Sequence, residues 1–254
     1  MAKKIKNKIV KFPRTGTRAA MQFYEVYSEI QDFLFFIYKL ANTVDNIQKI
    51  TSKGLLKFAS AEERHTRLKA KSKTVSPIEE MRRQRQVIVE IVLVRHVENY
   101  LNYLSQLLFE IFTQRPETLR SSDKVEVSRV LKHNSISELV TELAQRKVDG
   151  LAYSSFEDLS EFFTDRFGLT VTSGTTENNL IEAIEIRNIS VHNRCVVNER
   201  YVKRTGCKKE MIGRRREVGS EDLQTIEEML VSVVALDSSA RKKLKLKGVR
   251  FKKN

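Results

Sequence analysis

The feature that most restricts the fold of this chain is the spacing of its apolar side chains, which recur three and four residues apart. Between residues 22 and 50 this spacing runs from Phe23 through Ile37 to Val44. It gathers apolar side chains on one side of an α-helix, whereas the alternating pattern of a strand is scarce. Pro and Gly, which often interrupt helices, number only three and nine in 254 residues. The sequence therefore predicts an all-α helical bundle.

Local signals indicate where several helices begin and end. Ser76-Pro77, with Glu79 three residues after Ser76, is typical of a helix start, and Arg115-Pro116 should end that helix near Gln114. Ser155 should cap a helix that Gly168 ends. We expect three further helices, which begin at Ser137, at Thr175 or Thr176, and at Ser220.

The helix over residues 22–50 has more apolar surface than one neighbour can cover. Phe35, Phe36 and Tyr38 widen its apolar face beyond a single stripe. Such a face is covered by two neighbouring helices or forms a contact between subunits. The sequence leaves both alternatives open.

The formal net charge of +14 comes from the two ends of the chain. Residues 1–18 carry seven Lys and Arg and residues 241–254 carry eight, with no acid in either segment, so 31 bases face 32 acids elsewhere. Basic ends of this kind bind polyanions such as RNA without reading sequence, or are simply solvated. We predict a basic arm (1–20), a helical N-terminal extension (21–75), a helical domain (76–240) and a basic tail (241–254).

Other features exclude several classes of protein. Cys195 and Cys207 form no CxxC motif, which favours a reducing compartment without a disulfide framework. The first residues lack the apolar run of a secretory signal, and the apolar segment that begins at Phe33 is too short to span a bilayer. We therefore expect a cytoplasmic protein that does not enter a membrane and that carries neither a metal ion nor another cofactor.

The segment IEIRNISVHN places three polar residues on a helix whose core face includes Leu180 and Ile184. They are Arg187, Asn188 and His192, and burying an unpaired cation costs several kcal/mol. Asn188 lies four residues before His192, so its amide could orient the imidazole. Arg187 lies about 140° around the helix from His192. A guanidinium that holds a phosphate, beside an imidazole that moves a proton, would explain these three residues.

The same residues also allow plainer interpretations. Arg187 could form a structural pair with Glu182 or Glu185, with His192 buried at the helix end. A metal site of His192 and the two cysteines would lack a fourth ligand. A basic cluster follows the motif and could guide RNA toward it or be a solvated run: Lys208, Lys209, Arg214, Arg215 and Arg216.

The pattern R-N-x-x-x-H on the penultimate helix resembles the HEPN superfamily (higher eukaryotes and prokaryotes nucleotide-binding domain). Three segments resemble its RiboL-PSP branch: RHVENYLNYL at Arg95–Leu104, RNISVHNRCVVNERYV at Arg187–Val202, and LVSVVALDSSARKKL in the last helix. The likeness covers about residues 85–245, so the first 75 residues match no family by this comparison.

The resemblance implies a metal-independent endoribonuclease that cleaves RNA through attack by the 2′-OH. Arg187 and His192 would be its catalytic residues, with Asn188 as the intervening polar residue. It also implies a homodimer with a composite active site, and a toxin or anti-phage defence effector with an antitoxin or another defence component as partner. One alternative is a HEPN-fold protein that binds RNA or nucleotide without cleavage or serves as a regulatory subunit. Another is a helical scaffold whose aromatic face docks a partner protein.

Overall fold

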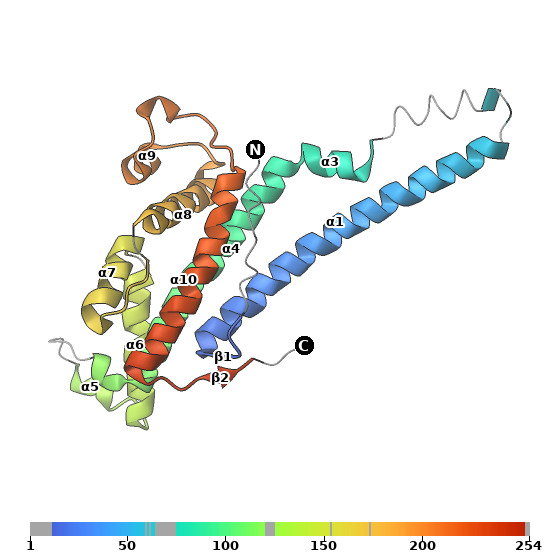
Figure 1. The fold of residues 1–254 in the computed structure, drawn as a ribbon. Helices are drawn as coiled ribbons and strands as arrows, with labels where there is room; N and C mark the ends of the chain where they lie inside the picture. Colours follow the sequence, from blue (N-terminus) through green and yellow to red (C-terminus); the bar gives the residue numbers. More distant parts are fainter. Residues whose placement is uncertain are drawn as a thin grey trace. The chain divides into compact units, whose positions relative to one another are not determined.

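The computed structural model describes residues 12–58, 60, 62–63, 75–119, 125–152, 154–172 and 174–251. These residues form helices and one two-stranded sheet, which confirms the predicted all-α fold (Figure 1). No helix in the described part of the chain is long and apolar enough to cross a membrane. The elements are β1 (Thr15–Gly16), α1 (Arg18–Phe58), α3 (Pro77–Arg83), α4 (Arg85–Gln114), η1 (Pro116–Leu119), α5 (Val127–Val130), α6 (Ile136–Ala152), α7 (Phe156–Phe167), α8 (Thr175–Asn193), α9 (Glu199–Thr205), η2 (Lys209–Met211), α10 (Ser220–Leu244) and β2 (Val249–Arg250).

The chain divides into two compact units. The larger unit contains the described residues of 1–26 and 93–254, and the smaller unit contains those of 27–92. Both α1 and α4 contribute residues to each unit, so neither unit is a continuous piece of chain that ends between helices. Residues 1–11 of the predicted basic arm and most of residues 59–74, within the predicted N-terminal extension, lie outside the described residues.

Two of the predicted helix boundaries are present with their expected hydrogen bonds. Ser155 accepts from the Asp158 amide at 3.1 Å, and the Asp158 carboxylate accepts from the Ser155 amide at 3.0 Å. This reciprocal capping box opens α7, and Gly168, at φ 61°, ends it in the left-handed conformation that glycine adopts without steric cost. Ser76 caps α3 by accepting from the Glu79 amide, with Pro77 at the first helical position.

The predicted end of α4 at Gln114 and the predicted starts of α8 at Thr175 and of α10 at Ser220 are also confirmed, whereas two other boundaries differ from the structure. The helix expected from Ser76 to Gln114 is interrupted at Gln84, which separates α3 from α4. α6 begins at Ile136, because Ser135 rather than Ser137 accepts from the Glu138 amide, and it passes through Gly150 to Ala152. The short helices α5 and α9 were not expected, since helices of four and seven residues contain too few turns to show a period.

The core of the larger unit forms around α4 and α10, which lie side by side (Figure 1). Two tyrosines of α4 reach α10 through their hydroxyls: Tyr100 is 2.9 Å from the Ser232 hydroxyl, and Tyr103 donates to the Val233 carbonyl at 3.4 Å. Partnered hydroxyls let large rings be buried without an unsatisfied polar atom. The fully buried apolar side chains of these two helices include Leu93, Val97, Leu104, Leu107, Leu108, Ile111, Met229, Val233, Leu236 and Ala240.

The two ends of the described chain meet at Asp237 of α10. The Thr17 amide and hydroxyl both donate to this buried carboxylate, and the Thr17 hydroxyl accepts from the Ala20 amide at 3.1 Å to cap α1. β1 pairs antiparallel with β2, with Thr15 opposite Arg250. Residues 241–244 complete α10, so the described part of the predicted basic tail is folded against the start of the chain rather than free.

In the smaller unit α1 packs through one narrow face. Ala41 and Asp45 are buried there, and the Ser76 hydroxyl that caps α3 also donates to the Asp45 carboxylate at 3.1 Å. Within the described residues, no second neighbour covers the rest of this apolar helix. The exposed large side chains of α1 are Phe33, Phe35, Phe36, Tyr38, Leu40, Ile47 and Ile50.

The buried imidazole of His96 should make the stability of the protein depend on pH. Burial lowers the pKa of His96 to about 4, below the value of about 6.5 expected in the unfolded chain. Between these two values the unfolded state binds more protons, so the free energy of unfolding should rise with pH, by about 3 kcal/mol in total. In His96→Gln this contribution should vanish, as measured by urea unfolding at pH 4.5, 5.5 and 7. Equal pH slopes for the two proteins would contradict it.

Candidate functional site

α8 carries the three residues of the RNxxxH motif, but it does not bury all of them. Its buried apolar face consists of Leu180, Ala183, Ile184, Ile186 and Ile189. Arg187 and Asn188 are half-buried, whereas His192 is exposed. The expectation that all three lie on the core face is therefore wrong for His192, which sits in the last turn of α8 beyond Ile189, the last buried residue of this helix.

The guanidinium of Arg187 is held in one orientation by two acceptors. Its Nη2 donates to Oε1 of Glu98 on α4 at 3.1 Å, and its Nη1 donates to Oδ1 of Asn188 at 3.1 Å. The expected contact between Asn188 and His192 is absent from the described hydrogen bonds, since Asn188 instead faces Arg187. The other oxygen of Glu98 lies 3.9 Å from Arg95. The partner of Arg187 is thus neither Glu182 nor Glu185.

Glu185 is the deeply buried charge of α8, with 1% of its side chain exposed. Two arginines of α9 neutralise it: Nε of Arg204 is 3.3 Å from Oε1 of Glu185, and Nε of Arg200 is 3.3 Å from Oε2. Arg204 also contacts Glu157 of α7. The sequence reading missed this cluster. The sequence pattern that could have predicted it is two acids three residues apart, Glu182 and Glu185, followed by two arginines four residues apart.

Glu182 takes part in a second cluster, which contains Arg216. Nη2 of Arg216 is 3.1 Å from Glu182 and 2.7 Å from Asp222, and its Nε donates to the Tyr201 hydroxyl at 3.2 Å. The Tyr201 hydroxyl in turn donates to Glu182 at 3.0 Å, and burial raises the pKa of Tyr201, which keeps it a neutral donor. Arg216, which the sequence left open as an RNA contact or a solvated residue, instead makes contacts inside the protein.

A sharp corner follows the motif at the end of α8. Arg194 and Cys195 have φ angles of 53° and 61°, two consecutive non-glycine residues in the left-handed region. Such residues are sparsely populated in this region and persist where their surroundings hold them. Here the side-chain amide (Nδ2) of Asn193 donates to the Val196 carbonyl at 2.7 Å, and the buried Cys195 thiol is 2.8 Å from the Ser190 hydroxyl. The corner fixes the direction in which the chain leaves His192.

The chain after this corner pairs with the predicted basic loop. The Val197 amide donates to the Arg214 carbonyl at 2.9 Å, and the Arg216 amide donates to the Cys195 carbonyl at 2.8 Å. Arg214 and Arg215 are exposed. The fold thus brings these two arginines beside the end of α8. Lys208 and Lys209 are exposed at the start of η2, and no described hydrogen bond or ion pair joins them to α8.

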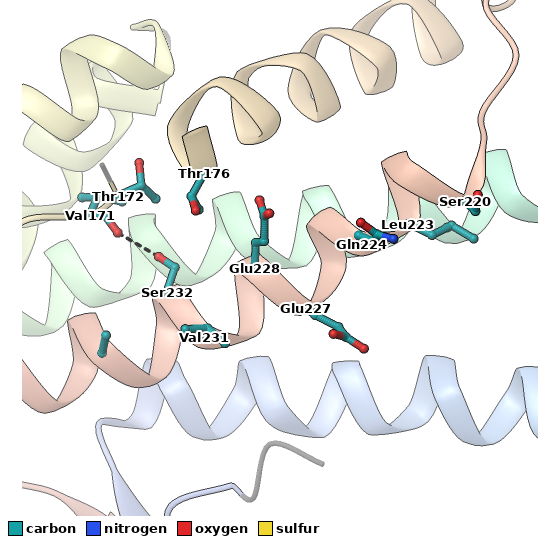
Figure 2. Close-up of a pocket in the computed structure, with 11 residues that line it drawn as sticks. Val171, Thr172, Thr176, Ser220, Leu223, Gln224, Glu227, Glu228, Val231 and Ser232 are labelled. Atoms are coloured by element: carbon teal, nitrogen blue, oxygen red, sulfur yellow. Dashed lines mark hydrogen bonds between the residues drawn. The ribbon is translucent and has the colours of Figure 1, made fainter. Parts of the chain in front are cut away.

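A groove of about 720 Å³ lies along α10 near the start of α8, away from the motif (Figure 2). Thr172 and Thr176 line it on one side, and the carboxylates of Glu227 and Glu228 project from α10 (Figure 2). Asn179 donates to both oxygens of Glu228, at 3.0 and 3.1 Å. The groove contains none of the residues singled out in the sequence, and its two acidic side chains are unsuited to a phosphate. Within the described ranges, no group of three or more His, Cys, Asp or Glu side chains is arranged to hold a metal ion.

No protein-family model, curated protein or solved structure matches this chain. The resemblance to the HEPN superfamily therefore stays a prediction from the quoted segments. The function of the site has to be argued from its own residues, which are an exposed imidazole, an oriented guanidinium and two exposed arginines next to the helix end.

The two glutamates of α8 should differ sharply in their contribution to stability. Glu185→Ala leaves Arg200 and Arg204 without their shared buried carboxylate, so the free energy of unfolding should fall by about 3 kcal/mol. Glu182→Ala is the matched control, because its side chain is 42% exposed and its loss should cost less than about 1 kcal/mol. Urea unfolding of both variants measures the difference. Equal losses would mean that burial does not set the strength of these pairs.

Proposed function

We propose that this protein is a metal-independent endoribonuclease in which Arg187 and His192 are the catalytic residues. The observation that carries the proposal is the pairing of two unlike groups on one helix. α8 presents an exposed imidazole within two turns of a guanidinium whose orientation Glu98 and Asn188 hold. Preorganised donors of this kind stabilise charge that develops in a transition state, because they need little rearrangement when the reaction occurs.

RNA supplies its own nucleophile, so the enzyme needs only to move protons and stabilise charge. The 2′-oxygen attacks the adjacent phosphorus and loses its proton to a base, while the 5′-oxygen of the next nucleotide leaves and gains a proton. The products are a 2′,3′-cyclic phosphate and a free 5′-OH. A histidine side chain can both accept and donate protons near neutral pH, and such acid–base catalysis is worth on the order of 10²–10⁴ in rate.

Arg187 would stabilise the crowded, negatively charged phosphorane. A guanidinium has five N–H donors, and the contacts with Glu98 and Asn188 occupy two of them. Of the other three, the Nε–H is buried inside the protein, so the two N–H groups left on the terminal nitrogens would be the ones that reach phosphate oxygens. In a homodimer with two motifs facing one cleft, one His192 would act as the base and the other as the acid.

The charge around the helix end supports RNA as the substrate. Arg214 and Arg215 are exposed on the loop that pairs with the chain just after α8. Such residues contact phosphates and position a strand without reading its sequence. We propose that the enzyme acts on cytoplasmic RNA as a toxin or an anti-phage effector, with an antitoxin or another defence component as its regulator.

One observation favours a second function, the binding of RNA or nucleotide without cleavage. The charge of Arg187 is already balanced by Glu98 at 3.1 Å, so a phosphate has to compete with this carboxylate. A site that only binds anions tolerates such competition. The two functions differ in whether the strand is cut, and one assay separates them.

Replacing His192 should abolish cleavage without unfolding the protein. We expect wild type to cut a single-stranded RNA oligomer in EDTA and to leave 2′,3′-cyclic phosphate ends, whereas His192→Ala and Arg187→Ala should not. Val191→Ala is the control, because it changes an exposed neighbour in the same turn of α8. Gel analysis of the products and the far-UV circular dichroism of each variant provide the measurement.

The outcomes of this assay separate the two functions. RNA that binds wild type but stays intact would support the binding function and rule out the nuclease. Cleavage of a matched DNA oligomer, which has no 2′-OH, would rule out the proposed chemistry.

The arginines of the basic loop should differ in their effect on RNA affinity. Each phosphate contact contributes about 0.7 to the slope of log affinity against log salt for a single strand, so Arg214→Ala with Arg215→Ala should lower that slope by roughly 1.4. Arg216→Ala is the matched control, since this side chain binds Glu182 and Asp222 and should affect stability instead. Fluorescence anisotropy of labelled RNA measures this slope between roughly 50 and 200 mM salt, the range over which phosphate contacts lose most of their affinity. An unchanged slope in the double variant would exclude this loop from the interface.

A further inference from the structure

α1 carries a regular apolar stripe on a side that the described residues leave exposed. The stripe consists of Phe33, Phe36, Leu40, Thr43, Ile47 and Ile50. The intervals between these residues are three, four, three, four and three, an average close to 3.5 residues. A straight α-helix has 3.6 residues per turn, so a stripe with a 3.5-residue period stays in line only when two helices coil around each other. This is the a and d pattern of a coiled coil.

The stripe is exposed along its whole length. The five large apolar side chains in it are 49% to 71% exposed, and Thr43 is exposed as well. At roughly 150–250 Å² for a large side chain, they leave about 500 Å² of apolar surface open on each chain. That area is at the upper end of what monomers expose, and it is more than half of the about 800 Å² that each partner buries in a standard interface.

The intrachain neighbours of α1 lie on a different face. Ala41 and Asp45 are buried and Leu34, Ile37 and Val44 are half-buried, a set that lies at heptad positions b, e and f when Phe33 is a. The described residues that flank the stripe on its other side, at position g, are all exposed: Asp32, Lys39, Asn46 and Lys53. The a and d stripe and its g flank are therefore both available to a partner.

We propose that a second copy of this chain covers the stripe, so that two α1 helices form an antiparallel coiled coil. In the proposed alignment, Phe33 of one copy faces Ile50 of the other, Phe36 faces Ile47, and Leu40 faces Thr43. The numbers of facing residues then always sum to 83. Each layer then combines a larger with a smaller side chain. This inference goes beyond the proposed nuclease and does not depend on it.

The charges beside the stripe select the antiparallel arrangement. In antiparallel pairs g faces g, which brings Asp32 next to Lys53 and Lys39 next to Asn46 of the other copy. In a parallel pair g faces e, which would set Asp32 and Lys39 against the apolar Ile37 and Val44. The stripe itself contains no charged residue, so two copies meet there without repulsion between like charges.

The test of this interface uses two phenylalanines that are neighbours in the sequence. Phe36 lies in the stripe and is 58% exposed, whereas Phe35 lies outside it and is 67% exposed. Light scattering of the full chain should give twice the chain mass of 29.5 kDa for wild type and for Phe35→Glu. Phe36→Glu should raise the dimer dissociation constant at least about a hundredfold, because each dimer buries two Phe36 side chains. Circular dichroism verifies that both variants stay helical.

Several results would overturn the interface. A monomeric wild type at all concentrations would do so, including one that binds lipid vesicles through the same helix. A Phe36→Glu variant that remains a dimer would also overturn it. That result would place the dimer contact elsewhere and would not affect the proposed composite nuclease site. Equal loss of dimer in Phe35→Glu and Phe36→Glu would indicate nonspecific adhesion of an aromatic surface.

The direction of the two helices is tested by crosslinking in a Cys207→Ser background, which leaves the buried Cys195 as the native thiol. Chains with Phe33→Cys and chains with Ile50→Cys are mixed and oxidised. The antiparallel arrangement predicts a disulfide between the two kinds of chain and none within either kind alone. Disulfides within each kind alone would show a parallel pair and refute the proposed direction.

Discussion

The larger unit depends on how the charges of α8 are neutralised. α8 lies against the core and carries Glu182, Glu185 and Arg187, of which Glu185 is fully buried, so leaving Glu185 unpaired would cost several kcal/mol. Each of the three pairs with an opposite charge on another element. Glu185 pairs with α9, Glu182 pairs with the loop before α10, and Arg187 pairs with α4. The charges of α8 are therefore matched only when these elements are packed beside it. The ion pairs determine which elements pack against α8, while burial of the apolar core supplies most of the free energy of folding.

The same pairing removes one residue of the basic loop from contact with a ligand. Three consecutive arginines look equivalent in the sequence, yet Arg216 turns inward to two carboxylates and a tyrosine hydroxyl, while Arg214 and Arg215 are exposed. At the other end of the site Glu98 fixes Arg187 and also balances its charge. A phosphate that binds there has to replace or share this carboxylate. The affinity of the site is thus set as much by Glu98 as by the arginine itself.

Local signals in the sequence predicted the fold well, and long-range contacts escaped them. The Ser155 and Gly168 boundaries rest on hydrogen bonds and a backbone conformation within a few residues, so the sequence was sufficient. The partner of Arg187 lies 89 residues away on α4, and no local pattern distinguishes Glu98 from the nearer Glu182 and Glu185. His192 was placed on the core face by helical period alone. Whether a face is covered depends on where the neighbouring helices end, which is a property of the tertiary structure.

The contact between Thr17 and Asp237 joins residues 220 positions apart, and it has a consequence for how the protein is made. At about 5–20 residues per second a ribosome needs roughly 10–40 s to synthesise the chain between them. Throughout that interval the first turn of α1 lacks its anchor on α10, and β1 lacks the strand with which it pairs. The helices between 77 and 205 leave the ribosome earlier and can form local turns, but the larger unit closes only when its last helix arrives. Ribosome-bound chains therefore carry an N-terminal helix that stays unanchored until α10 has been synthesised.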